Sequence, residues 1–144
     1  MGDTPVVLVV EDEWLLRDCI SAHLRAARWQ VLEARSGEAA IALLNAGKHV
    51  DVVVTDIELR GSINGWSVGE RFRTILPQIA VIYTSGNAWP SAQAVPKSLF
   101  ISKPYEPDAI AQACQITLCD ARTRCSRGSG VPSLASWQRA ASSL

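Results

Sequence analysis

Residues 6–13 read VVLVVEDE, an unbroken apolar run that is followed at once by three acidic residues. A run this uniformly apolar and β-branched is typical of a strand that is buried on both faces, as in a parallel sheet covered by helices. The acidic residues stand where that strand would end. The stretch therefore predicts a buried strand that delivers carboxylates to one edge of a sheet.

Beyond residue 13, short apolar runs alternate with segments of helical period. Helical spacing predicts a first helix over residues 13–28, and Ser36 is a suitable N-cap for a second helix that closes near Gly47. Further strands are expected at 29–33, 52–56, 79–83 and 99–102, and further helices at 65–76 and 108–118. Five β/α units in succession predict an α/β fold, a doubly wound five-stranded parallel sheet with helices on both faces.

One connection departs from this alternation. Gly86, Pro90 and Pro96 all fall between the last two expected strands. Glycine and proline interrupt helices, so the fourth helix is predicted to be shortened or irregular, at most a turn or two over residues 91–95.

The composition changes again after Asp120. Residues 121–144 are rich in Ser and Arg, contain no acidic residue and begin with the loop-like stretch ARTRCSRGSGVPS. We therefore expect one domain over 1–120 and a basic tail over 121–144, with a short helix near 133–142. A tail of this length is too short to form an effector domain.

Composition limits the possible functions. Of 144 residues, 48% are hydrophobic and 19% charged, and 14 basic side chains balance 14 acidic ones, which argues against a whole-surface nucleic-acid or membrane binder. The chain starts without a basic leader, and no apolar run approaches the roughly 18 residues of a membrane span, so a cytoplasmic protein is predicted. The four cysteines lack the spacing of a zinc site.

Polar residues stand at the end of each central strand. Ligands of a doubly wound sheet gather outside the carboxyl ends of its strands. The residues expected there are Glu11, Asp12, Asp56, Ser85 and Lys103. Converging carboxylates repel one another, and a hard cation such as Mg²⁺ would stabilise them through oxygen ligands. Such a site suits phosphoryl transfer onto a carboxylate, with Lys103 and Ser85 contacting phosphoryl oxygens.

Four motifs resemble those of the response-regulator receiver family of two-component signalling. They are LVVEDE at 8–13, VVVTDIEL at 52–59, VIYTSG at 81–86 and ISKP at 101–104. The resemblance implies a flavodoxin-like sheet with strand order 2-1-3-4-5. It also implies that the shortened fourth helix belongs to the face that contacts partners, so we expect an altered output surface.

The resemblance also implies a role for each site residue. Residues that would handle the phosphoryl group are Asp56 as phosphoacceptor, Lys103 as phosphate-binding lysine, Ser85 as switch hydroxyl and Phe100 as aromatic switch. Residues that would hold Mg²⁺ (or Mn²⁺) are Asp12 and Asp56 directly, Glu58 through its main-chain carbonyl and Glu11 through water. The Glu58 side chain adds a carboxylate that could reach the phosphoryl group or the metal, and we hypothesise that it tunes the lifetime of the phosphorylated state.

The implied function is that of a stand-alone response regulator. A histidine kinase would phosphorylate Asp56, and the protein would then switch protein–protein interactions, or pass or drain phosphate through a phosphotransfer protein in a relay. It would catalyse only its own phosphorylation and dephosphorylation, as a monomer or homodimer, without nucleic acid or membrane as partner.

Two other functions use similar residues. A haloacid-dehalogenase-like phosphatase also has an aspartyl nucleophile, Mg²⁺ and a lysine, but it requires a second aspartate where Glu58 stands. A receiver-like scaffold that takes no phosphate is disfavoured because no site residue is missing.

Overall fold

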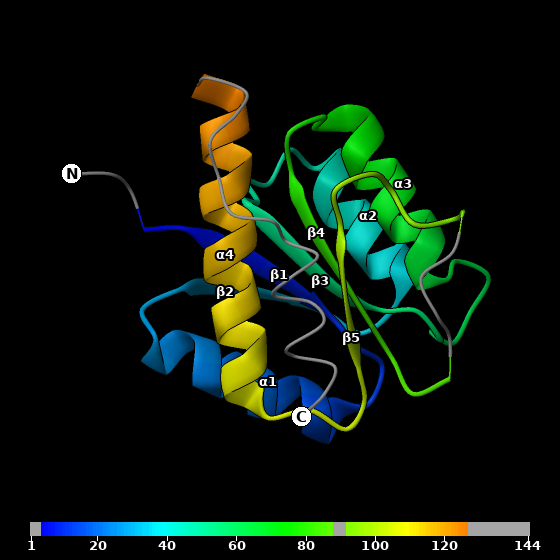
Figure 1. The fold of residues 1–144 in the computed structure, drawn as a ribbon. Helices are drawn as coiled ribbons and strands as arrows, with labels where there is room; N and C mark the ends of the chain where they lie inside the picture. Colours follow the sequence, from blue (N-terminus) through cyan, green and yellow to red (C-terminus); the bar gives the residue numbers. More distant parts are fainter. Residues whose placement is uncertain (1–3, 88–91, 127–144) are drawn as a thin grey trace.

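The computed structural model describes residues 4–87 and 92–126, which form a parallel sheet between two layers of helices (Figure 1). The strands lie in the order β2-β1-β3-β4-β5, and each neighbouring pair is parallel. The predicted doubly wound, flavodoxin-like sheet is thus confirmed. The strands are β1 (Val6–Val10), β2 (Gln30–Ala34), β3 (Val52–Asp56), β4 (Ala80–Ser85) and β5 (Leu99–Ser102).

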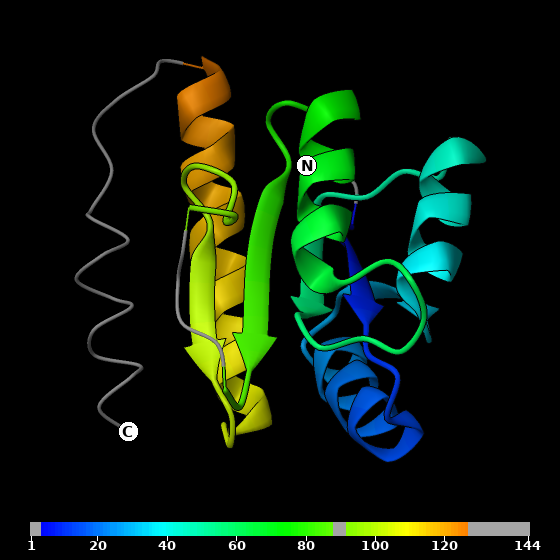
Figure 2. The ribbon, with the colours of Figure 1, turned by 90° about the vertical axis from the view of Figure 1, so that its right-hand side faces the viewer.

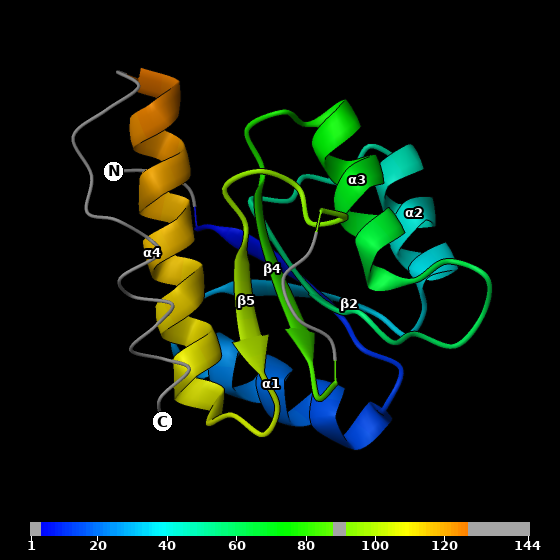
Figure 3. The same ribbon diagram turned by 45° about the vertical axis from the view of Figure 1, so that its right-hand side comes forward.

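Helices cover both faces of the sheet, as Figures 2 and 3 show from two further directions. One face carries α1 (Trp14–Ala26) and α4 (Pro107–Ser126), and the other carries α2 (Gly37–Asn45) and α3 (Gly65–Ile75). Every residue of β1 is buried because this strand lies between β2 and β3 in the sheet and is covered on both faces. Its side chains alternate, so that Leu8 joins the apolar cluster of α2 and α3, and Val9 joins that of α1 and α4.

Local sequence chemistry sets the helix starts. The Ser36 hydroxyl accepts a hydrogen bond from the Ala39 backbone N–H at 3.0 Å, as predicted for an N-cap. Asn64 caps α3 in the same way. Gly65 follows, and a Cβ at this position would overlap the carbonyl oxygen of Asp56. Glycine therefore allows α3 to begin directly against the end of β3.

The connection between β4 and β5 contains turns and no helix over residues 92–98, which we call the 92–98 segment. This confirms the shortened or irregular fourth helix for these residues, whereas 88–91 lie outside the described ranges. The Tyr83 hydroxyl accepts a hydrogen bond from the Val95 N–H at 3.2 Å, and Arg73 Nη1 donates to the Pro96 carbonyl at 2.6 Å. Side chains of β4 and α3 thus hold the segment in place.

The last helix is longer than predicted. We expected it to end at Leu118, but α4 continues to Ser126. Residues 119–126 contain no glycine or proline, the Thr123 hydroxyl donates to the Cys119 carbonyl at 2.8 Å, and Ala121 is buried against the sheet. The loop expected after Asp120 is therefore wrong for residues 121–126.

The short helix expected near residues 133–142 lies outside the described residues. None of the helices within residues 4–87 and 92–126 has the length and apolar character of a membrane span.

Candidate functional site

Three carboxylates meet where β1 and β3 end. Oxygen atoms of Glu11, Asp12 and Asp56 all lie within 4.8 Å of one another. Glu11 and Asp56 are only 2% and 5% exposed, and Asp12 lies at the more open side of the cluster. The structure therefore brings together the acids that the strand ends were expected to deliver. We call this cluster, together with Lys103 and Ser85, the acidic crevice.

Burial disfavours the ionised forms of Glu11 and Asp56. Burial, followed by the charge of Asp56, raises the pKa of Glu11 from 4.5 to about 7. Burial also raises the pKa of Asp56, although the Lys103 ammonium opposes that shift. A cation bound to these oxygens would remove much of the repulsion. The acidic crevice is thus electrostatically suited to a positive ligand.

Lys103, directly after β5, supplies one positive charge. Its Nζ lies 3.1 Å from Oδ2 of Asp56 and 3.2 Å from Oε1 of Glu11. Burial alone would lower the pKa of Lys103, but the charges of Asp56 and Glu11 outweigh burial and raise the pKa. The ammonium therefore stays charged at neutral pH. It can neutralise an anionic group carried by Asp56.

The donor atoms fit a hard divalent cation. With all three acids ionised, the single charge of Lys103 leaves an excess of two negative charges among these four residues. The Glu58 N–H donates to Oδ1 of Asp56 at 3.3 Å, which places residue 58 beside the cluster. Carboxylate and carbonyl oxygens are the ligands that Mg²⁺ and Mn²⁺ prefer. The residues present therefore fit such an ion.

Ser85 ends β4 and is 1% exposed. Its hydroxyl lies 2.8 Å from each carboxylate oxygen of Glu58 and accepts a hydrogen bond from the Asn87 N–H at 3.0 Å. We expected the Glu58 side chain to reach toward the phosphoryl group or the metal. In the structure it hydrogen-bonds Ser85 instead.

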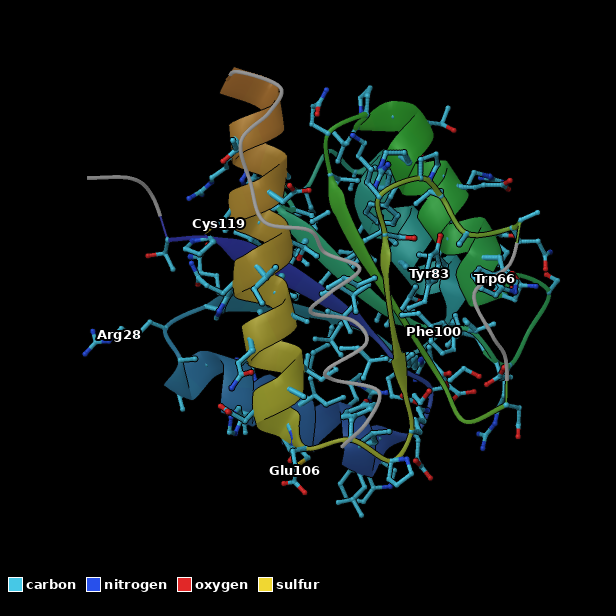
Figure 4. The ribbon with its side chains drawn as sticks, viewed as in Figure 1. Arg28, Trp66, Tyr83, Phe100, Glu106 and Cys119 are labelled. Carbon is cyan, nitrogen blue, oxygen red and sulfur yellow. The ribbon has the colours of Figure 1, made fainter. Side chains whose placement is uncertain are left out.

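Phe100 in β5 lies opposite Tyr83 in the register of β4 and β5 and is 4% exposed. Figure 4 shows Trp66, Tyr83 and Phe100 on the same side of the sheet. The rings of Trp66 and Tyr83 are tilted, with centroids 4.7 Å apart. The predicted switch residue is thus packed into the apolar cluster beneath α2 and α3.

Sequence reasoning missed two residues near the acids. Tyr105 packs on the α1 and α4 cluster, and its pKa is raised by burial and further by the charges of Glu11 and Asp56. Its place two residues after Lys103 is a signal that could have identified it. Arg60 donates its backbone N–H to Asp12 at 3.0 Å. No sequence pattern indicates this contact because it depends on the path of the loop after β3.

Comparisons with known proteins agree with this geometry. The family profile described as response regulator receiver domain matches residues 7–115. The heme response regulator HssR of Staphylococcus haemolyticus is 29% identical over 102 residues, which cover 69% of this chain and 45% of that protein. A putative NtrX-like response regulator of Rickettsia conorii is 31% identical over 120 residues, 77% of this chain and 25% of that protein. The chain thus spans less than half the length of either relative.

Solved structures match over most of the described fold. A response regulator receiver protein from Sinorhizobium medicae is 30% identical with a TM-score of 0.79, and the match covers 83% of this chain and 98% of that chain. The receiver domain of the hybrid histidine kinase CckA is 27% identical with a TM-score of 0.68, and the match covers 78% of this chain and 98% of that chain.

Proposed function

The chain belongs to the response regulator receiver domain family, and on that premise we propose that Asp56 accepts a phosphoryl group from a histidine kinase. One observation carries the proposal. Asp56 ends a buried strand, the Lys103 ammonium lies 3.1 Å from its Oδ2, and carboxylate oxygens of Glu11 and Asp12 lie within 4.8 Å. An acceptor carboxylate needs this combination of a cation for the phosphoryl charge and oxygen ligands for a metal.

The transfer exchanges one bond for another. An Asp56 carboxylate oxygen forms a bond to phosphorus as the phosphorus–nitrogen bond of the kinase phosphohistidine breaks. The electron pair of the broken bond returns to the imidazole, which recovers a proton from solvent. Lys103 neutralises one phosphoryl oxygen and the Ser85 hydroxyl donates to another.

Asp12, Asp56 and the Glu58 carbonyl would hold Mg²⁺ or Mn²⁺ directly, with Glu11 acting through water. When bound, the metal ion supplies positive charge that offsets the acids and the incoming phosphoryl oxygens. Chelation should therefore prevent phosphorylation while the fold remains intact.

The consequence of phosphorylation is a change in protein contacts, in which Ser85 and Phe100 form the switch. The downstream partner is a target protein or a phosphotransfer protein, and the cytoplasm is the compartment in which we place this exchange. The Phe100 ring lies beside Tyr83, which holds the 92–98 segment. A movement of the Phe100 ring would therefore change the contacts of the 92–98 segment.

Acetyl phosphate with Mg²⁺ provides a direct test, read by intact mass. We expect the chain to gain one phosphoryl group that is lost on standing, and we expect no gain for Asp56→Ala or after addition of EDTA. Asp18→Ala, which removes an exposed acid of α1, is the matched control and should behave like the parent. A gain that persisted in Asp56→Ala would refute the assignment.

The same experiment separates the other two functions. Continuous release of phosphate from a simple phosphate ester would favour a phosphatase of the haloacid-dehalogenase type. A parent chain that never gained mass from acetyl phosphate or from a phosphorylated kinase would favour the scaffold.

A further inference from the structure

The Ser85 hydroxyl is already committed to a negatively charged partner. Its Oγ lies 2.8 Å from both Glu58 carboxylate oxygens. A hydroxyl has one hydrogen to donate, so the two oxygens share that single hydrogen. A lone pair of Ser85 Oγ accepts a hydrogen bond from the Asn87 N–H at 3.0 Å. Donation to any other acceptor would break the contact with Glu58.

Glu58 is also tied to the residue that we propose as phosphoacceptor. Its N–H donates to Oδ1 of Asp56 at 3.3 Å, and its negative charge acts to raise the pKa of Asp56. One residue therefore connects Asp56 through its backbone with Ser85 through its carboxylate. Ser85 is 1% exposed, so its hydroxyl needs a partner inside the protein.

We propose that Glu58 is a positioning residue that competes with the phosphoryl group for the Ser85 hydroxyl and thereby weakens retention of that group on Asp56. The inference rests on the proposed function, because it needs a phosphoryl group at this position. It specifies how the chain limits its own phosphorylated state.

The competition follows from the number of hydrogens and the charges. A phosphoryl group on Asp56 requires the hydroxyl hydrogen that Glu58 holds, and the released Glu58 carboxylate then faces another anion. Loss of a charge-assisted hydrogen bond of this kind corresponds to a change of about tenfold in affinity. Competition for one hydrogen therefore predicts that most of the effect of Glu58 passes through Ser85.

A simpler explanation is charge alone, and a pair of substitutions separates the two. If Glu58 acts only by long-range repulsion, Glu58→Ala changes affinity equally with and without the Ser85 hydroxyl. If Glu58 competes for the hydroxyl, its effect largely disappears in the Ser85→Ala background. Such a double-mutant cycle isolates the interaction between the two side chains.

The probe is trifluoroberyllate with Mg²⁺, a stable mimic of the phosphoryl group, and its affinity is followed by fluorine NMR. We expect Glu58→Ala to bind the probe about tenfold more tightly than the parent, and Ser85→Ala about tenfold more weakly. In the Ser85→Ala background, Glu58→Ala should change the affinity less than about threefold. Glu13→Ala removes an exposed acid at the N-cap position of α1 and should change affinity equally in both backgrounds.

A second measurement reports on Ser85 directly. Because the Asn87 N–H is bonded to Ser85 Oγ, its amide resonance should shift in Glu58→Ala and stay in place in Glu13→Ala. Equal effects of Glu58→Ala in both backgrounds, weaker binding in Glu58→Ala or an unmoved Asn87 resonance would overturn the proposal. A parent chain that bound no trifluoroberyllate would instead refute the proposed function, so the two failures are distinguishable.

Discussion

The acidic crevice and the 92–98 segment both depend on β4, through Ser85 in one and Tyr83 in the other, yet they are held by different kinds of contact. In the crevice, Asp56 and Glu11 are buried beside each other and share one ammonium. In the segment, each hydrogen bond pairs a donor with a neutral acceptor: the Tyr83 hydroxyl accepts from the Val95 N–H, Ser98 donates to the Val95 carbonyl at 2.7 Å, and the Arg73 guanidinium donates to the Pro96 carbonyl.

Because of this difference, we expect the acidic crevice to determine phosphoryl chemistry and the contacts around Tyr83 to determine stability. Burying like charges opposes folding unless a cation is bound, whereas a satisfied buried hydrogen bond supports folding. Substitutions in the crevice should therefore remove chemistry with little loss of stability. Substitutions around Tyr83 should remove stability and leave the chemistry of Asp56 in place.

The largest effect is expected for Asp56→Asn. The amide cannot accept a phosphoryl group, so uptake from acetyl phosphate should be lost completely. In EDTA the free energy of unfolding should stay equal to that of the parent or rise by about 1 kcal/mol, because a buried charge is removed. Urea denaturation with and without EDTA checks this, with Asp18→Asn as the control. A loss of stability beyond about 1 kcal/mol would show that the Asp56 and Lys103 pair supports the fold.

The pH dependence of Glu11→Gln is the next largest effect. The pKa of Glu11 is about 7 in the folded protein against 4.5 for an unperturbed carboxyl, so its protonated form favours folding. That contribution is complete below about pH 4.5 and is lost as pH rises through 7. In EDTA, Glu11→Gln should therefore gain stability over the parent by about 3 kcal/mol between pH 4 and pH 8. A constant difference across this range would contradict the charge burial described for the crevice.

The crevice could be predicted from the sequence because parallel strands deliver their ends to one edge of the sheet. The apolar runs before Glu11 and Asp56 marked two buried strands, and their order in the sheet brings these residues together. The contact between Glu58 and Ser85 could not be predicted. It depends on the rotamer of one loop side chain and on the path of the chain between β3 and α3.

The 92–98 segment illustrates the opposite case. Pro90 and Pro96 predicted a shortened or irregular helix, but no sequence pattern indicated which groups would hold the connection in its place. The Tyr83 hydroxyl reaches Val95 because Gly69 leaves room for it on α3. A contact among three residues so far apart in sequence arises only from tertiary packing. The extension of α4 beyond Leu118 was missed for a related reason, since Ala121 is held by the core that it covers.

Gly69→Ala tests the room beside Tyr83. A Cβ at position 69 would overlap the Tyr83 hydroxyl. The gain in helix propensity, about 1 kcal/mol, is smaller than the cost of displacing the ring, so we expect a net loss of about 2 kcal/mol. Thr74→Ala, an exposed change in the same helix, should not destabilise the protein. Phosphoryl uptake by Gly69→Ala below its unfolding temperature should stay within about twofold of the parent. A larger fall would show that packing around Tyr83 also controls the chemistry of the acidic crevice.

The smallest effect is expected for Tyr83→Phe, which keeps the ring beside Trp66 and deletes only the hydroxyl. The Val95 N–H then loses its acceptor in a buried position, at a cost of about 1 kcal/mol. Amide exchange at Val95 should accelerate by roughly fivefold to tenfold, while uptake of phosphoryl groups remains that of the parent. Tyr105→Phe deletes the hydroxyl of the tyrosine near the crevice and should leave Val95 exchange unchanged. If Val95 exchanged equally slowly in both variants, the segment would be held by Arg73 and packing, and the Tyr83 hydroxyl would have no part in it.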